Sequence, residues 1–211
     1  MTARKSSRPR NPLEYEQRFW GRGVFRVAGV DEVGRGPLAG PVVACALVLP
    51  VDVCVEGADD SKRLTAEVRR RLVERIRASG AAIGLGAASV REIERLNILE
   101  ATTLAMRRAL AALPERPQHI AVDGRPVRGL GWEHDAIVGG DGLVHSIGCA
   151  SIVAKVVRDD LMQRLAQRYP AYGWHSNAGY GTPAHMQALA ERGPTPHHRR
   201  TFLGVQHTLD L

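Results

Sequence analysis

The stretch VAGVDEVGRGPLAGPVVACALVL, residues 27–49, places two adjacent acids and a glycine-rich loop between two apolar runs. The run FRVAGV over residues 25–30 and the run VVACALVL over residues 42–49 are short, apolar and rich in β-branched residues, which predicts two buried strands. The connecting segment DEVGRGPLAGP, residues 31–41, is predicted to be a loop. Asp31 and Glu32 therefore stand where a strand ends and the glycines begin.

Downstream segments alternate between helical and strand patterns. Capping residues and apolar spacing predict helices from Thr65 to about Ser79, over residues 89–113 as two helices or one bent helix, over about 149–169, and over 183–193. Short apolar runs that lead into acids and glycines predict strands within residues 119–124 and 135–142, and the tail beyond Pro194 is expected to be irregular. Strands interleaved with helices predict an α/β sheet.

Size and composition favour one soluble domain with an anionic partner. The chain has 211 residues, 44% of them hydrophobic and 24% charged, and its formal net charge is +7. This charge favours binding to nucleic acid, although a solubilising surface explains it equally well. The longest apolar run, residues 42–51, is shorter than the roughly 20 residues of a membrane span and contains Pro50. No membrane association is therefore expected, and a monomer is the default expectation.

The termini and the cysteines indicate organisation and location. Residues 1–23 are predicted to form a basic, flexible extension of a single domain that spans residues 24–211. The first ten residues carry four cations, no acid and no hydrophobic segment, which excludes a secretory signal and leaves an organelle transit peptide as the alternative. The cysteines Cys45, Cys54 and Cys149 show no C-x-x-C spacing, which is typical of structural thiols in a reducing cytoplasm.

The glycine loop admits three interpretations. Residues 34–39, GRGPLA, match the dinucleotide-binding pattern G-x-G-x-x-A, but Gly40 and Pro41 interrupt the helix that such a site requires. Asp31 and Glu32 would also repel a pyrophosphate. Adjacent acids at a strand end instead suit a hard divalent cation, and glycines let backbone amides approach a sugar-phosphate chain. A solvated acidic turn is the remaining alternative.

Two further acids can complete a metal site. Asp123 closes the predicted strand at 119–124, and Asp159 shares one face of the predicted 149–169 helix with Ser151 and Lys155. The alternative for this face is an ordinary Lys155–Asp159 ion pair at the surface. Asp160, about 100° away around the helix, is expected to be only solvated.

Clustered carboxylates require compensating cations, because like charges raise one another's pKa. With two cations about 4 Å apart, one activates water and the other stabilises the leaving 3′ oxygen. This chemistry predicts a nuclease or phosphotransferase. The alternative from another class is a catalytically silent nucleic-acid-binding module, against which the four acids count.

Seven motifs follow one another between Val27 and Phe202. They are VAGVDEVGRGPLAGPVVA from residue 27, DSKRLT at 60–65, LNILEATTLAM at 96–106, AVDG at 121–124, ASIVAKVVRD at 150–159, GYGT at 179–182 and HHRR at 197–200. With these motifs the chain resembles the ribonuclease HII family, the bacterial type 2 ribonucleases H. The resemblance implies a ribonuclease H-like mixed α/β sheet flanked by helices, with a small helical C-terminal part.

The same resemblance implies an activity and a site. The expected enzyme is an endonuclease that cuts the RNA strand of RNA–DNA hybrids and nicks duplex DNA 5′ of an embedded ribonucleotide, leaving 3′-hydroxyl and 5′-phosphate ends, with Mg²⁺ or Mn²⁺ as cofactor. Its acidic tetrad falls on Asp31, Glu32, Asp123 and Asp159. The implied substrate contacts are Gly34, Arg35 and Gly36 for the ribonucleotide backbone, and Tyr180 for the 2′-hydroxyl and the adjoining deoxyribose. Ser151 and Lys155 are expected to contact substrate phosphate or to support the metal ligands, and Lys62 is expected to contact DNA.

The chain departs from the common family pattern at two places. Gly139 and Ala178 stand where many relatives carry lysine. We therefore expect other basic residues, such as Arg199 and Arg200, to supply phosphate contacts. The adjacent His197 and His198 are predicted to have surface or packing roles, because neighbouring histidines point in different directions.

Overall fold

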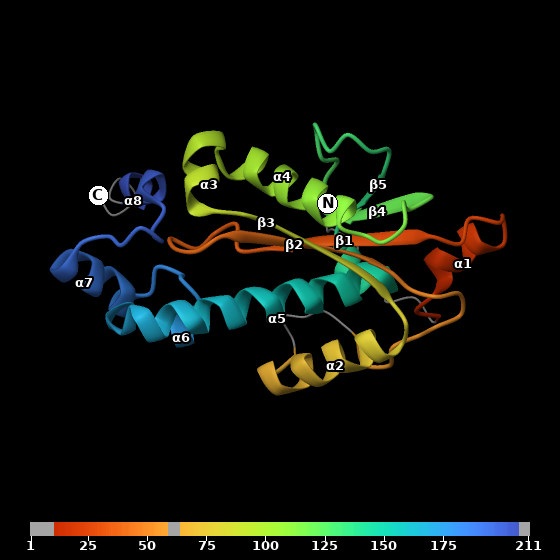
Figure 1. Cartoon of the computed structure of the whole chain (residues 1–211), viewed down its shortest axis with the longest axis horizontal. Helices are drawn as coiled ribbons and strands as arrows, with labels where there is room; N and C mark the ends of the chain where they lie inside the picture. Colours follow the sequence, from red (N-terminus) through yellow and green to blue (C-terminus); the bar gives the residue numbers. More distant parts are fainter. Residues whose placement is uncertain (1–10, 59–63, 207–211) are drawn as a thin grey trace, which may run out of the picture.

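The computed structural model describes residues 11–58 and 64–206 of the chain (Figure 1). Its single sheet has the order β3-β2-β1-β4-β5. The strands are β1 (Val27–Val33), β2 (Val42–Val48), β3 (Ala82–Ala88), β4 (His119–Asp123) and β5 (Asp135–Ile137). β2 runs antiparallel to β1 and β3, whereas β1, β4 and β5 are parallel to one another. The predicted α/β class with a mixed sheet is confirmed.

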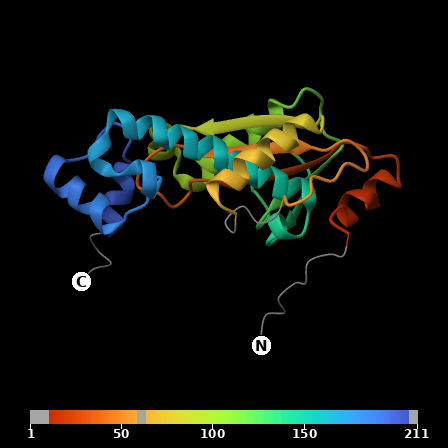
Figure 2. The same ribbon diagram turned by 90° about the horizontal axis from the view of Figure 1, so that it is seen from below.

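Helices cover both faces of this sheet and extend beyond one end of it. They are α1 (Glu14–Trp20), α2 (Ala66–Ala78), α3 (Val90–Leu96), α4 (Ile98–Ala111), α5 (His145–Arg168), α6 (Trp174–Asn177), α7 (Pro183–Arg192) and α8 (Arg200–Gln206). In Figure 1, α3 and α4 lie on one face, α2 and α5 on the other, and α6 to α8 gather at one end. Figure 2 shows α2 and α5 crossing the near face. None of the helices in the described ranges is long and apolar enough to cross a membrane.

The two-residue period of the strands divides the core. In β1, Val27 packs toward the α2 and α5 side, whereas Ala28 and Val30 pack toward α4. A third cluster, which includes Met162 and Trp174, joins the far end of α5 to the C-terminal helices. The expected small helical C-terminal part is therefore present and has its own packing.

Local sequence signals account for most helix starts. The Thr65 hydroxyl caps α2, and Ser89 forms a capping box with Glu92 at the start of α3. Asn97, with φ of 71°, separates α3 from α4 and accepts from the backbone N–H of Leu99 and Glu100. The predicted helical stretch over 89–113 is therefore two helices.

The N-terminal prediction needs a correction. Within the predicted extension, residues 11–23 belong to the fold: Leu13 and Trp20 are buried in the core of the α5 face. Glu16 of α1 is 1% exposed, and its Oε1 accepts from the backbone N–H of Ser146 at 2.8 Å. A carboxylate at this place satisfies an amide in the first turn of α5. Residues 11–23 therefore pack against the α5 face as part of the described fold.

Three element boundaries also differ from the expectations. β1 continues to Val33, so Asp31 and Glu32 lie in the strand and not in the loop. α5 begins at His145, four residues before the predicted start at Cys149. The tail beyond Pro194 contains α8 and an isolated β-bridge between Ala39 and His198.

Candidate active site

The parallel pairing of β1 and β4 brings the first and third acids together. Val30 is in register with Val122, so Asp31 and Asp123 follow at the next position of each strand. Parallel strands end at the same edge of a sheet, and β1 runs from here into the glycine loop. The strand pairing therefore places two of the four predicted acids, Asp31 and Asp123, on neighbouring strands at the same edge.

Asp31 is the most deeply placed of these acids, with 7% of its surface exposed. Burial raises its pKa well above the ordinary value, and the nearby carboxylates of Glu32 and Asp123 raise it further. A hydrogen bond from Ser151 and the backbone N–H of Glu32, at 2.7 Å from Oδ1, act in the opposite direction. Asp31 is thus a carboxylate whose charge requires a cation for compensation.

Glu32 and Asp123 complete the coupled set. Burial raises the pKa of Glu32, Arg35 opposes that rise from 3.3 Å, and Asp123 adds to it. Asp123 Oδ1 accepts from the backbone N–H of Gly140 at 2.7 Å, which fixes this side chain against the segment 140–142. The structure therefore brings Asp31, Glu32 and Asp123 into one electrostatic unit.

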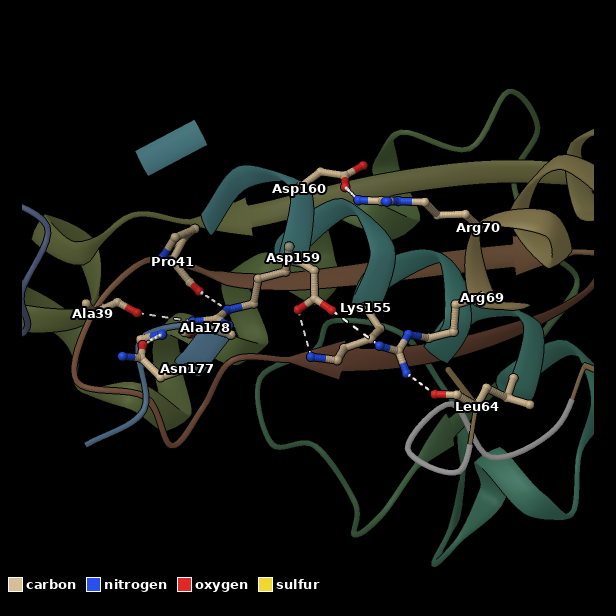
Figure 3. Close-up of polar contacts among 12 residues, drawn as sticks. Ala39, Pro41, Leu64, Arg69, Arg70, Lys155, Asp159, Asp160, Asn177 and Ala178 are labelled. Atoms are coloured by element: carbon tan, nitrogen blue, oxygen red, sulfur yellow. Dashed lines mark hydrogen bonds and ion pairs between the residues drawn. The ribbon is translucent and has the colours of Figure 1, made fainter. Parts of the chain in front are cut away.

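Asp159 lies on α5 in a cationic setting (Figure 3). Its Oδ1 accepts from Lys155 Nζ at 2.7 Å, and its Oδ2 is 3.6 Å from Arg69 of α2. The ion pair that the sequence offers as the alternative is therefore present, and Arg69 adds a partner that the sequence does not indicate. Asp160 is not merely solvated, because it pairs with Arg70 at 3.0 Å.

Within the described part of the chain, no three histidine, cysteine or acidic side chains form a ready-made metal cage. Mg²⁺ typically takes one or two carboxylates and completes its shell with water and substrate phosphate. The buried oxygens of Asp31, together with those of Glu32 and Asp123, fit such an open oxygen site. A cation there would also relieve the repulsion that raises the pKa of Asp31.

The glycine loop and the loop of Tyr180 form one surface. Tyr180 is 49% exposed, and an ideal Cβ built on Gly36 would lie 3.6 Å from Tyr180 Cε1. The backbone N–H of Leu38 donates to the carbonyl of Gly179 at 2.8 Å. Arg35 and Gly36 are exposed beside this contact. The predicted substrate residues of the two loops are therefore neighbours, while Lys62 lies outside the described residues.

Two buried histidines, His185 and His198, are hydrogen-bonded to each other, and His185 binds the backbone of Tyr180. The backbone N–H of Thr195 donates to His198 Nδ1 at 2.9 Å, so the His198 proton lies on Nε2, which is 3.0 Å from His185 Nε2. His185 then donates from Nδ1 to the Tyr180 carbonyl at 2.8 Å. Both rings are neutral in this arrangement, and the predicted packing role of His198 is correct.

The expected role of Arg199 is wrong. This side chain is 0% exposed, and its guanidinium donates to backbone carbonyls of the glycine loop. It is therefore not available to a phosphate on the surface. Arg158 is equally buried and donates to the same region, and sequence spacing carries no signal of this because its partners are backbone carbonyls of distant segments.

Comparisons with known proteins agree with this geometry. A family model described as Ribonuclease HII matches residues 28–205. Ribonuclease HII of Thermosynechococcus vestitus is 55% identical over 193 residues, covering 90% of this chain and 90% of the relative. The crystal structure of ribonuclease H2 from Pyrococcus horikoshii matches with a TM-score of 0.72 at 31% identity, covering 83% of this chain and 92% of that one.

A third comparison concerns fold alone. Bst-RNase HIII, crystallised in complex with Mn²⁺, has a TM-score of 0.66 at 18% identity, covering 90% of this chain and 71% of that one. The family match spans nearly all of the described residues, and the match to the Thermosynechococcus vestitus relative covers 90% of both chains. The chain belongs to the ribonuclease HII family.

Proposed function

We propose that this ribonuclease H-type endonuclease cuts the RNA strand of RNA–DNA hybrids and nicks duplex DNA on the 5′ side of an embedded ribonucleotide, leaving 3′-hydroxyl and 5′-phosphate ends. Family membership and the fold give the endoribonuclease activity on hybrids. The observation that carries the finer proposal is the position of the carboxylate cluster of Asp31, Glu32 and Asp123 at the strand edge that leads into the Gly36–Tyr180 surface.

The proposed cofactor is Mg²⁺ or Mn²⁺, two ions when substrate is bound. The Mn²⁺ complex of Bst-RNase HIII and the oxygen donors of this site support that choice. When bound, such ions activate a water molecule and stabilise the leaving 3′ oxygen of an in-line displacement. Asp31, Glu32, Asp123 and Asp159 are the proposed ligands, with Asp31 held in position by Ser151.

The cationic residues next to the acids are suited to the substrate. Lys155 lies beside Asp159, and Arg35 lies beside Glu32, so each acid has a donor for a phosphate oxygen next to it. A lysine or arginine in this setting neutralises a carboxylate in the unliganded protein and binds the nucleic-acid backbone when substrate arrives. We assign Lys155 and Arg35 this role.

The exposed ring of Tyr180 is proposed to distinguish RNA from DNA. The 2′-hydroxyl is the one group by which a protein separates the two at a given nucleotide. Tyr180 offers both a hydroxyl and a flat ring beside the exposed residues Arg35 and Gly36. This combination allows the sugar and its backbone to be read together.

We also propose that the enzyme acts as a monomer in the cytoplasm. Cys45 and Cys149 are buried thiols, which supports a reducing compartment. Size-exclusion chromatography with light scattering tests the monomer: a mass near 23.0 kDa supports it, and twice that mass contradicts it.

A hydrolysis assay with a matched pair of variants tests the proposed function. An RNA–DNA hybrid is incubated with wild type, Asp123→Asn and Asp160→Asn in Mg²⁺, in Mn²⁺ and in EDTA. We expect cleavage by wild type and Asp160→Asn in either metal, and loss of cleavage with EDTA and in Asp123→Asn. Binding without cleavage by the wild type in both metals would identify a silent nucleic-acid-binding module instead.

A further inference from the structure

Two arginines are buried beneath the substrate surface without acidic partners among the described residues. Arg158 of α5 and Arg199, which precedes α8, are each 0% exposed, and no ion pair joins either to a described carboxylate. Burying a guanidinium is costly unless its donors are all satisfied. Burial and the neighbouring Arg158 lower the pKa of Arg199 to about 9. The hydrogen bonds that the two guanidinium groups donate must therefore offset this electrostatic cost.

Arg158 bridges the two loops through Ala39, Pro41 and Ala178, which are labelled in Figure 3. Its Nε donates to the Pro41 carbonyl at 3.0 Å, and its Nη2 donates to the Ala39 carbonyl at 3.1 Å. Its Nη1 donates to the carbonyl of Ala178 at 3.0 Å, two residues before Tyr180. The planar guanidinium of Arg158 thus connects the end of the glycine loop to the segment that leads from Ala178 to Tyr180.

Arg199 draws the two ends of the glycine loop together. Its Nη2 donates to the carbonyls of Gly34 at 2.6 Å and Gly40 at 2.8 Å, and its Nη1 donates to the Arg35 carbonyl at 2.9 Å. The Nε donates to Gly40 as well, at 2.9 Å. Gly34, with φ of +94°, has no room for a side chain, since an added Cβ would lie 2.1 Å from Arg158 Nε.

This geometry fixes the direction of two backbone amides. In a trans peptide the N–H points opposite to the carbonyl that precedes it. Because the carbonyls of Gly34 and Arg35 point inward to Arg199, the N–H groups of Arg35 and Gly36 point away from it. Neither N–H donates to another described residue. Two amide donors are therefore presented at the exposed positions beside Tyr180.

We propose that Arg158 and Arg199 are positioning residues that hold the glycine loop and Tyr180 as one rigid unit and turn the amides of Arg35 and Gly36 toward the ribonucleotide. The inference rests on the proposed function, since it concerns how the 2′-hydroxyl and the adjoining backbone are read. Both arginines act through the loops and touch no substrate. The specificity for a ribonucleotide thus depends on Arg158 and Arg199, two buried side chains that do not contact the substrate.

Lysine substitutions give the sharpest test. Lysine keeps the buried charge and most of the volume, but its single ammonium cannot span carbonyls that a planar fork reaches. Arg158→Lys and Arg199→Lys are compared with Arg192→Lys, at an exposed arginine of α7. Leu110→Ala, in the core of the α4 face, serves as the control for lost stability. All variants are studied at a temperature at which circular dichroism shows them folded.

The readout is the ratio of affinities for a duplex with one ribonucleotide and for an all-DNA duplex of the same sequence, measured in EDTA. We expect the ratio to fall about tenfold in either lysine variant, equivalent to about one or two lost hydrogen bonds, with unchanged affinity for all-DNA. Arg192→Lys and Leu110→Ala should keep the wild-type ratio. If one arginine variant does not fold, the other still tests the proposal, because each binds different carbonyls.

The outcomes separate the two proposals. Wild type that shows no preference for the ribonucleotide and does not cut beside it contradicts the proposed function. Wild type that discriminates, together with lysine variants that match Leu110→Ala, overturns the positioning role alone.

Discussion

Lys155 Nζ lies 2.7 Å from Oδ1 of Asp159, one turn further along α5. Both side chains are partly exposed, and an ion pair of this kind contributes about 0.3–0.5 kcal/mol. The pair is therefore a weak stabilising contact. Its value lies in placing a cation next to a proposed metal ligand.

Replacement of Asp159 by asparagine should separate catalysis from stability. We expect Asp159→Asn to lower kcat by at least about a hundredfold. Losing a group that only supports a metal ligand typically costs about 10–100-fold in activity, and losing the ligand itself should cost more. The free energy of unfolding should change by less than about 1 kcal/mol. Asp160→Asn, which removes the outward-facing pair with Arg70, is the matched control and should keep wild-type kcat. Equal kcat in both variants would remove Asp159 from the site.

Truncation of Tyr180 should affect substrate recognition and little else. Because the side chain is 49% exposed, Tyr180→Ala should leave the thermal midpoint nearly unchanged. Loss of the ring should lower kcat/KM on a single-ribonucleotide duplex by about tenfold or more, in line with aromatic contacts to nucleotides. Tyr180→Phe should retain the part that depends on the ring. Steady-state kinetics with the three proteins checks this order, and equal kcat/KM in all three would refute it.

Gly140 should not tolerate a side chain. A Cβ there would lie 2.8 Å from Ile147 Cδ1 and 3.4 Å from Asp123 Oδ1, while its N–H donates to that same oxygen. Since Ile147 is fully buried, Gly140→Ala should destabilise the protein by about 1–3 kcal/mol and shift Asp123. Gly142→Ala meets nothing within 4 Å and should change stability by less than about 1 kcal/mol. Urea unfolding and cleavage assays report both effects; tolerance of both alanines would contradict the packing argument.

The histidine pair predicts a loss of stability in acid. Burial, followed by the neighbouring His185 and His197, lowers the pKa of His198 to about 4, below its ordinary 6.5. As the pH falls, His198 therefore binds a proton in the unfolded state before it does so in the folded state. The stabilisation that neutral His198 contributes is complete above pH 6.5 and is lost between about pH 6.5 and 4. The loss reaches about 3 kcal/mol at the low end.

Because buried acids also titrate in this pH range, the contribution of His198 has to be measured as a difference between a variant and wild type. The raised pKa values of Asp31, Glu32 and Glu16 act in the opposite direction, because the folded state then takes up protons more readily. The free energy of unfolding is measured against pH for wild type, His198→Gln and the exposed control His175→Gln. Only His198→Gln should flatten the decline below pH 6.5, and a slope equal to that of wild type would contradict the assignment.

The sequence predicts most of the fold because its signals are local. Caps at Thr65 and Ser89 mark helix starts, and apolar runs mark β1, β2 and β4. β3 was not predicted, because its glycines dilute the apolar pattern. An added Cβ at Gly84 or Gly86 would lie 2.1 Å from an α4 carbonyl, so these glycines permit close helix packing that only the tertiary structure shows.

The start of α5 illustrates the same limit. No side chain of its own N-cap residue binds the helix, and the carboxylate that does so belongs to Glu16, 130 residues away. A sequence window cannot contain that contact. The sequence therefore predicts a start at Cys149, later than the observed start at His145, and it predicts an extension where Glu16 lies in α1.

Some residues of the candidate site can be predicted from the sequence, and others cannot. Asp31, Glu32 and Asp123 follow apolar strands, which makes them recognisable as acids at a strand edge. Arg69, Arg158 and Arg199 act across distant segments, so their spacing carries no signal. The absence of the family lysines at Gly139 and Ala178 predicts a phosphate contact for Arg199, whereas this side chain is buried against backbone carbonyls.

Mapping of the cut in a labelled DNA duplex with one ribonucleotide tests the central claim most directly. The duplex and an all-DNA control are incubated in Mg²⁺, in Mn²⁺ and in EDTA, and the product ends are identified at nucleotide resolution. The account predicts a metal-dependent nick on the 5′ side of the ribonucleotide, with 3′-hydroxyl and 5′-phosphate ends and an intact control. Cleavage of the all-DNA duplex, or no cleavage of either duplex in both metals, would contradict it.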